Sequence, residues 1–416
     1  MQLSKRLHKN VYWEVLFFLP LFITPQGLYQ SIATEDGLHL GDSGLVFPIY
    51  FFIGSFLFLY VLMLFIKEKK IFILSSEIKK VVLCIGTVGF FIASTGVIIY
   101  SDINAYVRFV QMITGFAGLF ISWYLFEYKK LDIEKFFGQL GLMYFWIIII
   151  NYLYSFTEVG LASFGRALRP SLGLFDIYQT HVYYPFILTT VLYMSLPYIM
   201  KRYKWFIYPY IGLYFLNLLS WQVRGAIISF LLMLLIAFFV KFKVLQKVNI
   251  ILFSILFLCL LIYNFGLELI VGRFDNTSGV QSLSGRTDIW KSVFEDFYMV
   301  DFLFGDFYQD IDGITAHNQY LEFLSLGGVL LLLALLTTLF YLLVFIWSNF
   351  QKREINLLYF GLILLIQWIV DFNVNVPISN TNPAIFAWFY LNSIFVMLNI
   401  NENKNLEKNE RSFKSL

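Results

Sequence analysis

The chain is poor in charge and in cysteine. Only 14% of its 416 residues are charged, which is well below the share of about 25% that is typical of soluble domains. The two cysteines, Cys84 and Cys259, both lie inside apolar runs, so neither a disulfide framework nor a thiolate metal site is expected. Because 59% of the residues are hydrophobic, we expect the chain in a bilayer rather than in water.

Several common catalytic motifs are also missing. The sequence contains no HExxH, Walker loop, GxSxG or CxxC pattern and no cluster of carboxylates. Zinc peptidases, nucleotide-driven pumps and serine hydrolases depend on such groups at fixed spacing. The chain therefore lacks the residues that these three classes need. We therefore expect no metal and no cofactor.

Long apolar segments, in contrast, recur from end to end. Each has about 17 to 23 residues, enough to cross roughly 30 Å of hydrocarbon as a helix. The sequence thus predicts an all-α integral membrane protein of about twelve transmembrane helices, with a polytopic domain over 1–400 and a cytoplasmic tail over 401–416. The predicted spans are 11–28, 45–66, 81–100, 106–126, 136–156, 180–200, 205–221, 225–242, 248–267, 327–347, 355–372 and 383–400.

Lysine and arginine indicate the orientation of these spans, because short cytoplasmic loops retain them and exported loops do not. If the basic N-terminus MQLSKRLHKN is inside, every second loop is basic as well, for example KEKKIFILSSEIKK and KFKVLQK. Of the 30 Lys and Arg, seven then fall on or near the outer side and 30 − 7 = 23 fall inside. We predict a multi-pass protein of the cytoplasmic membrane with both termini in the cytoplasm.

The seven outer cations are almost all arginine. A guanidinium group offers paired donors to phosphate or carboxylate oxygens and stays charged when partly desolvated, so this bias suggests an anionic ligand on the outer face. Arg224 is the sharpest case, because it lies at the outer mouth of two closely spaced spans. The alternative is that its side chain reaches up to lipid headgroups. The seven are Arg108, Arg166, Arg169, Arg224, Arg273, Arg286 and Lys291.

A long outer segment, 268–326, connects the ninth and tenth spans and is predicted to contain short amphipathic helices. Ser284 is a suitable N-cap for the first, which carries Arg286 in its first turn, where helical N–H groups favour an anion. Thr315 is expected to cap a second helix, which bears His317 and Asn318 near its start and continues into the tenth span. A histidine suits general-base chemistry near neutral pH, although a lone histidine is also a common packing residue.

The motifs of this region occur in a familiar order: RGA at the outer end of a middle span, then SGRTDIW, FLFGDF and AHNQYLEFLSLGGVLLL. In this order they resemble the bacterial O-antigen polymerase and O-antigen ligase superfamily. The resemblance implies a glycosyltransferase of the C-type, which takes sugar without metal from a polyprenyl diphosphate in an outer cavity. The matching catalytic positions are Arg224, Arg286 and His317.

The resemblance also suggests substrate-binding positions and partners. Arg169 fits a family tendency before the sixth span, although the Asn-Pro-Asn element that accompanies it is absent, and Arg166, Arg273 and Asn318 are the other candidates. The implied partners are an undecaprenyl-diphosphate-linked glycan, membrane lipids and a chain-length regulator, and no nucleic acid.

Four functions stay open at this point. Polymerisation of repeat units into O-antigen, capsule or exopolysaccharide is favoured, because SGR followed by an aromatic side chain is more similar to the polymerase branch. A ligase would instead transfer the glycan to the lipopolysaccharide core. A flippase or other transporter would suit twelve spans, but no convincing internal repeat is present. A wall-synthesis polymerase would use an outer-loop carboxylate, for which Asp296, Asp301, Asp306 and Asp312 are available.

Overall fold

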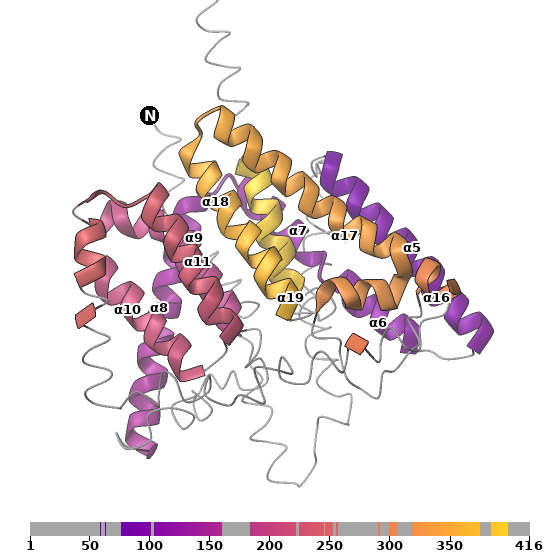
Figure 1. The fold of residues 1–416 in the computed structure, drawn as a ribbon, viewed down its shortest axis with the longest axis horizontal. Coiled ribbons are helices and arrows are strands. Elements are labelled where there is room, and N and C mark those ends of the chain that lie inside the picture. The colour runs from indigo at the N-terminus through magenta and orange to yellow at the C-terminus, as the bar shows by residue number, and fades with distance from the viewer. Residues whose placement is uncertain are drawn as a thin grey trace, which may run out of the picture.

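The structure is a computed structural model, and every regular element in its described part is a helix (Figure 1). The described residues are 59, 63, 76–100, 104–159, 184–221, 224–244, 246–252, 255–256, 290–291, 299–305, 318–374 and 384–397. The prediction of an all-α protein is confirmed for these residues. The helices are α5 (Ser76–Tyr100), α6 (Asn104–Thr114), α7 (Ala117–Ser122), the π-helix η1 (Trp123–Tyr128), α8 (Ile133–Val159), α9 (Tyr184–Arg202), α10 (Ile207–Trp221), α11 (Arg224–Val240), α16 (Met299–Phe304), α17 (Gln319–Gln351), α18 (Ile355–Ile366), the π-helix η6 (Gln367–Asp371), α19 (Phe372–Val374) and a helix at Ala384–Met397.

Three helical stretches in the described part are long and apolar enough to cross a membrane, namely Ile78–Thr95, Ile133–Ile150 and Gln319–Gln351. Shorter apolar helices occupy Ile207–Leu219, Gly225–Val240, Ile355–Asp371 and Ala384–Met397. These lengths and compositions indicate a membrane protein. Most of the predicted spans 11–28, 45–66 and 248–267 lies outside the described residues, so the count of twelve stays a prediction.

The predicted span 106–126 is not one continuous helix. The chain forms α6, a turn at residues 115–116, then α7 and η1. The interruption lies where Gly115 and Gly118 meet the helix 384–397. A Cβ atom at Gly118 would lie 2.0 Å from the Ile385 carbonyl oxygen, and one at Gly115 would lie 2.4 Å from the Ala384 Cβ. Close backbone packing of small residues, which apolar counting does not detect, therefore shapes this segment.

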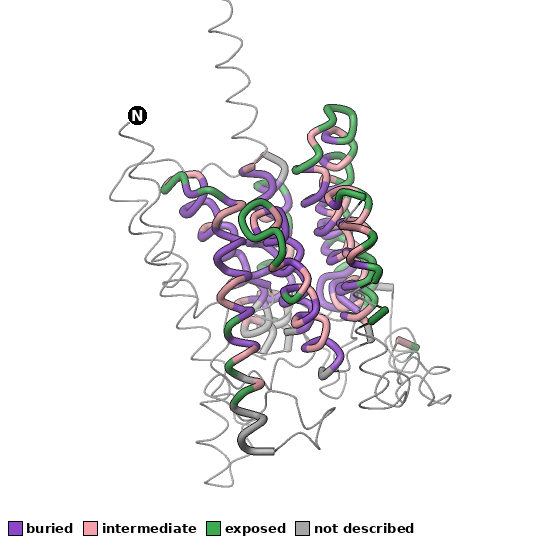
Figure 2. The backbone as a smooth tube through the Cα atoms, turned by 90° about the vertical axis from the view of Figure 1, so that its left-hand side faces the viewer, coloured by how far each residue is buried: buried purple, intermediate pink, exposed green. Residues whose placement is uncertain are grey.

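The long helices bury one face and expose another that is equally apolar. On one face of α17, Leu331, Leu335 and Leu342 are buried. On another face, Phe340 and Trp347 are 60% and 63% exposed. Figure 2 shows this alternation along the helices. An apolar exposed face of this size would favour aggregation in water and is appropriate against lipid tails.

Polar side chains inside the helices hydrogen-bond locally or across helix pairs, as a hydrocarbon environment requires. Thr189 and Thr338 donate to carbonyl oxygens one turn earlier in their own helices, at 2.7 and 3.1 Å. Between helices, the Tyr359 hydroxyl donates to the Tyr193 carbonyl and the Tyr193 hydroxyl donates to the Phe230 carbonyl, both at 2.8 Å. These bonds connect α18, α9 and α11 through the core.

A sharp kink divides α17 (Figure 1). Gly327 and Gly328 have non-helical backbone angles, and φ of Gly328 is +62°. The end of α16 packs against this kink, because a Cβ at Gly328 would lie 2.4 Å from Leu303 backbone atoms and one at Gly305 would lie 2.3 Å from the Gly327 and Gly328 nitrogens. The FLFGDF and LSLGG motifs therefore meet backbone to backbone. The predicted continuous entry into the tenth span is wrong at this point, because glycines allow the chain to bend there.

Helix ends that the charge pattern assigns to the cytoplasm contact one another. Lys201 at the end of α9 pairs with Glu134 at the start of α8, and Lys241, directly after α11, donates to Asn356 at the start of α18. α11 ends at Val240, two residues before the predicted boundary at 242, so Lys241 lies beyond the helix. These contacts agree with the predicted alternation of the spans.

Candidate functional site

One short segment, 367–374, joins the beginnings of two helices, α11 and α17, which the charge pattern assigns to the outer side. On one side, Ser229, in the second turn of α11, donates a 3.0 Å hydrogen bond to the Asp371 carboxylate. On the other side, the Asn318 amide, directly before α17, donates to the Asn373 side-chain oxygen at 3.3 Å. The structure thus places Ser229 and Asn318, which are far apart in sequence, against the same segment. Figure 1 shows the start of α17 beside α19.

Asn318 itself is the N-cap of α17. Its backbone is extended (φ −150°), and its side-chain oxygen accepts hydrogen bonds from the Tyr320 and Leu321 nitrogens. A helix running from Thr315 through Asn318 is therefore wrong, because asparagine caps a helix well and its extended backbone stops the helix at that point. The side chain is buried, and its oxygen is committed to the cap. Its amide group donates to the Asn373 side-chain oxygen in the neighbouring segment.

The segment η6 is a π-helical turn, a wide turn that is often found at functional sites. It ends at Asp371, which is 3% exposed and whose hydrogen bond in the described part of the chain comes from Ser229. The Trp368 carbonyl accepts from the Tyr320 hydroxyl at 3.0 Å. The buried Gln367 Oε1 and Trp368 Nε1 have no hydrogen-bond partner among the described residues. The turn therefore combines a carboxylate with spare hydrogen-bonding capacity.

Arg224 is the first residue of α11, and the structure describes its backbone position only. Ser229, in the next turn of α11, lies on the buried face of this helix. Of the other predicted positions, Arg166, Arg169, Arg273, Arg286 and His317 lie outside the described residues. The roles of these side chains stay predictions.

The structure describes only two residues of the first predicted amphipathic helix. Trp290 and Lys291 are helical, in agreement with the prediction, and Lys291 is exposed. The capping residue Ser284 and the remainder of this helix lie outside the described residues. Arg108 lies within α6.

Sequence reasoning missed Asp371, Ser229 and Asn373. A signal for Asp371 was present, since it ends the apolar run LILLIQWIVD, and an ionisable residue at such a place is a functional candidate by default. Ser229 gave no signal, because serine is common in membrane helices. Its importance follows from the contact with Asp371, which the structure alone provides.

Among the described residues, no group of three His, Cys, Asp or Glu side chains is arranged to hold a metal ion. A salt bridge, Lys201–Glu134, joins the end of α9 to the start of α8. No protein-family model matches the chain, and no curated protein matches it.

Proposed function

We propose that this protein polymerises polyprenyl-diphosphate-linked oligosaccharide repeat units by metal-independent, inverting glycosyl transfer on the outer face of the cytoplasmic membrane. The order of the motifs around Arg224, Arg286 and His317 suggests the reaction. The observation that supports it best is the contact of both the α11 and α17 starts with Gln367–Val374 through Ser229–Asp371 and Asn318–Asn373. A catalytic site built from distant motifs needs such a junction.

In this reaction, an acceptor hydroxyl attacks the anomeric carbon while the bond from that carbon to the diphosphate oxygen breaks. The hydroxyl proton passes to a base, for which His317 is the candidate. The lipid diphosphate leaves with additional negative charge, which Arg224 and Arg286 are suited to stabilise in place of a divalent cation. Arg166, Arg169 and Arg273 are candidates for further contacts with the phosphates or sugars.

Chain extension in a strain that lacks the endogenous protein tests this proposal. Substitutions Arg224→Ala, Arg286→Ala and His317→Ala should abolish elongated lipid-linked glycan while the protein stays in the membrane at normal levels. Lys291→Gln is the matched control, because it removes an exposed cation that is not one of the proposed catalytic or substrate-binding residues. Wild-type glycan length in any of the three variants would refute the role of that residue.

The purified protein distinguishes the alternatives. A polymerase lengthens glycans on the lipid carrier in detergent, a ligase needs lipopolysaccharide core as acceptor, and a transporter yields no product with either substrate. Failure to produce any glycan, with the intact protein and both acceptors present, would overturn the proposal of an enzyme.

A further inference from the structure

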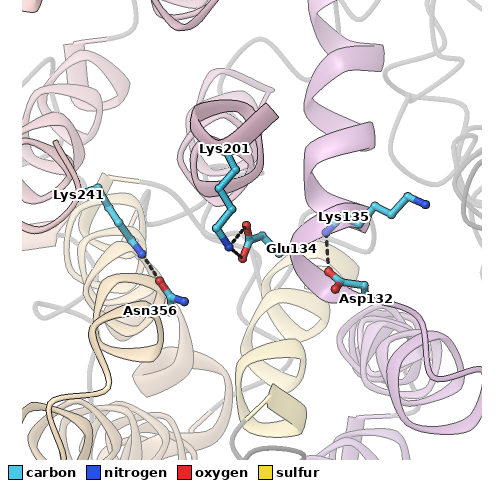
Figure 3. A network of polar contacts seen from close by, with 6 residues as sticks. All are labelled: Asp132, Glu134, Lys135, Lys201, Lys241 and Asn356. Atoms are coloured by element: carbon cyan, nitrogen blue, oxygen red, sulfur yellow. Dashed lines mark hydrogen bonds and ion pairs between the residues drawn. The ribbon is translucent and has the colours of Figure 1, made fainter. Parts of the chain in front are cut away.

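A second polar cluster lies at the opposite, predicted cytoplasmic end, where four helix ends converge (Figure 3). Glu134 comes from the start of α8, Lys201 from the end of α9, Lys241 follows α11, and Asn356 belongs to the start of α18. We refer to Lys201, Lys241, Glu134 and Asn356 as the inner cluster. Its residues come from four separate segments, so their arrangement depends on tertiary packing.

The inner cluster contains one cation more than its carboxylate can neutralise. Both oxygens of Glu134 contact the Lys201 ammonium, at 2.7 and 2.8 Å. Lys241 is half-buried, and its hydrogen-bond acceptor in the described part is the neutral side chain of Asn356. Its ammonium also lies 5.1 Å from the ring centroid of Tyr359. The cluster thus leaves the charge of Lys241 without an anion of its own.

Burial lowers the pKa of Lys241 to about 8, and the attraction of Glu134 opposes this shift while the repulsion of Lys201 adds to it. A half-buried ammonium under these conditions is stabilised by any additional anion that reaches it. Asp132, the other acidic residue in Figure 3, lies away from Lys241 at the start of α8, where its carboxylate accepts from the Lys135 backbone nitrogen at 2.8 Å.

Residues near the inner cluster have the composition of a membrane interface. Trp205, three residues after α9, is 80% exposed, and Tyr203 is partly exposed. Aromatic side chains of this kind concentrate at headgroup depth. A phosphate at that depth belongs to a lipid, and basic pockets between transmembrane helices on the cytoplasmic side recognise anionic headgroups.

We propose that Lys241, together with Lys201, binds the phosphate of an anionic phospholipid from the inner leaflet. The phosphate supplies the negative charge that the four converging segments lack. The lipid would connect the end of α11 to the ends of α9 and α18, and it lies at the opposite end of the protein from the proposed glycosyl-transfer site.

Titration of the purified full-length protein in detergent tests this inference. Phosphatidylglycerol is compared with phosphatidylcholine of the same acyl chains, and bound lipid is counted by native mass spectrometry alongside the unfolding temperature. Lys241→Gln should weaken phosphatidylglycerol binding about fivefold or more, and Lys241→Arg should retain it. Lys204→Gln, which removes an exposed cation close to Lys201 in the chain, should have a clearly smaller effect on phosphatidylglycerol binding.

Three results would overturn the site. If Lys241→Gln and Lys204→Gln weakened phosphatidylglycerol binding equally, the lipid would be attracted by the basic residues of this end in general and not by a specific site. Equal binding of phosphatidylcholine would show that no anion is selected. Stabilisation by inorganic phosphate alone, to the same extent as by the lipid, would assign the site to free phosphate.

Discussion

The two ends of this membrane domain use polar groups in opposite ways. At the predicted outer end, Asp371 is buried on a π-helical turn and receives a hydrogen bond from a serine. At the predicted inner end, Glu134, whose side chain is 19% exposed, pairs with Lys201, whose side chain is 66% exposed. Water and counterions screen an exposed pair, so its net contribution is small. A buried carboxylate with one hydroxyl partner is costly, and an ionisable group at such a depth is a functional candidate.

The glycine kink of α17 packs backbone to backbone against the end of α16, so a change there should have the largest effect. Gly328→Ala adds a Cβ that would lie 2.4 Å from the Leu303 backbone, at a residue whose φ is +62°. We expect a loss of about 3 kcal/mol or more, seen as strongly reduced folded protein in the membrane. Gly86→Ala is the matched control, because a Cβ there meets nothing within 4 Å. Equal yields of the two variants would show that the kink tolerates a side chain.

Asp371→Asn tests whether the buried carboxylate matters through its charge. The variant keeps the side-chain size and an oxygen that can accept from Ser229. If the charge supports the proposed site, chain extension should fall roughly tenfold to hundredfold at an unchanged protein level. Ser229→Ala removes only the donor and should have a smaller effect. Unchanged glycan length in Asp371→Asn would restrict this residue to packing.

At the inner end, Lys241 should make stability depend on pH. Burial lowers its pKa from 10.5 to about 8, so between these values the folded protein binds fewer protons than the unfolded chain. The free energy of unfolding of lipid-free protein should therefore rise as the pH increases through this window. Lys241→Gln should remove this component, measured as the unfolding temperature between pH 7 and 9.5, whereas Lys204→Gln should preserve it. If the unfolding temperature of the Lys241→Gln protein depended on pH in the same way as that of the wild type, this prediction would be refuted.

The smallest effect is expected for the exposed ion pair. Glu134→Gln removes the charge that pairs with Lys201. The Glu134 side chain is only 19% exposed, but its partner is 66% exposed and screened by water, so we expect a change of about 1 kcal/mol or less. Measurement of the unfolding temperature at low and high salt separates the screened component. A loss comparable with that of Gly328→Ala would show that the inner end is as dependent on its polar contacts as the outer end.

Sequence reasoning located helices well wherever apolar length was the only requirement. The predicted spans 136–156, 205–221 and 355–372 coincide with α8, α10 and the α18–α19 region. It was less successful for 106–126, where contact with the helix 384–397 interrupts the segment. Periodicity reports how a segment is buried, but not whether another backbone approaches closely enough to break it.

At the candidate site, sequence reasoning was also successful in part. Motif order indicated Arg224 and the His317–Asn318 region, but it assigned the helix cap to Thr315 instead of Asn318. Ser229 and Asn373 were not recognised, because a serine or an asparagine acquires its meaning from the group it contacts. Here those groups are Asp371, 142 residues away along the chain, and Asn318, 55 residues away.

The sequence by itself determined that the described chain is helical, apolar and suited to a bilayer, because hydrophobic length and composition act locally along each segment. Only the tertiary structure decided which polar groups meet: Asp371 with Ser229 at one end, and Lys201 and Lys241 with Glu134 and Asn356 at the other. Such contacts join segments that are distant in the chain. They depend on how helices pack against one another, which no single segment encodes.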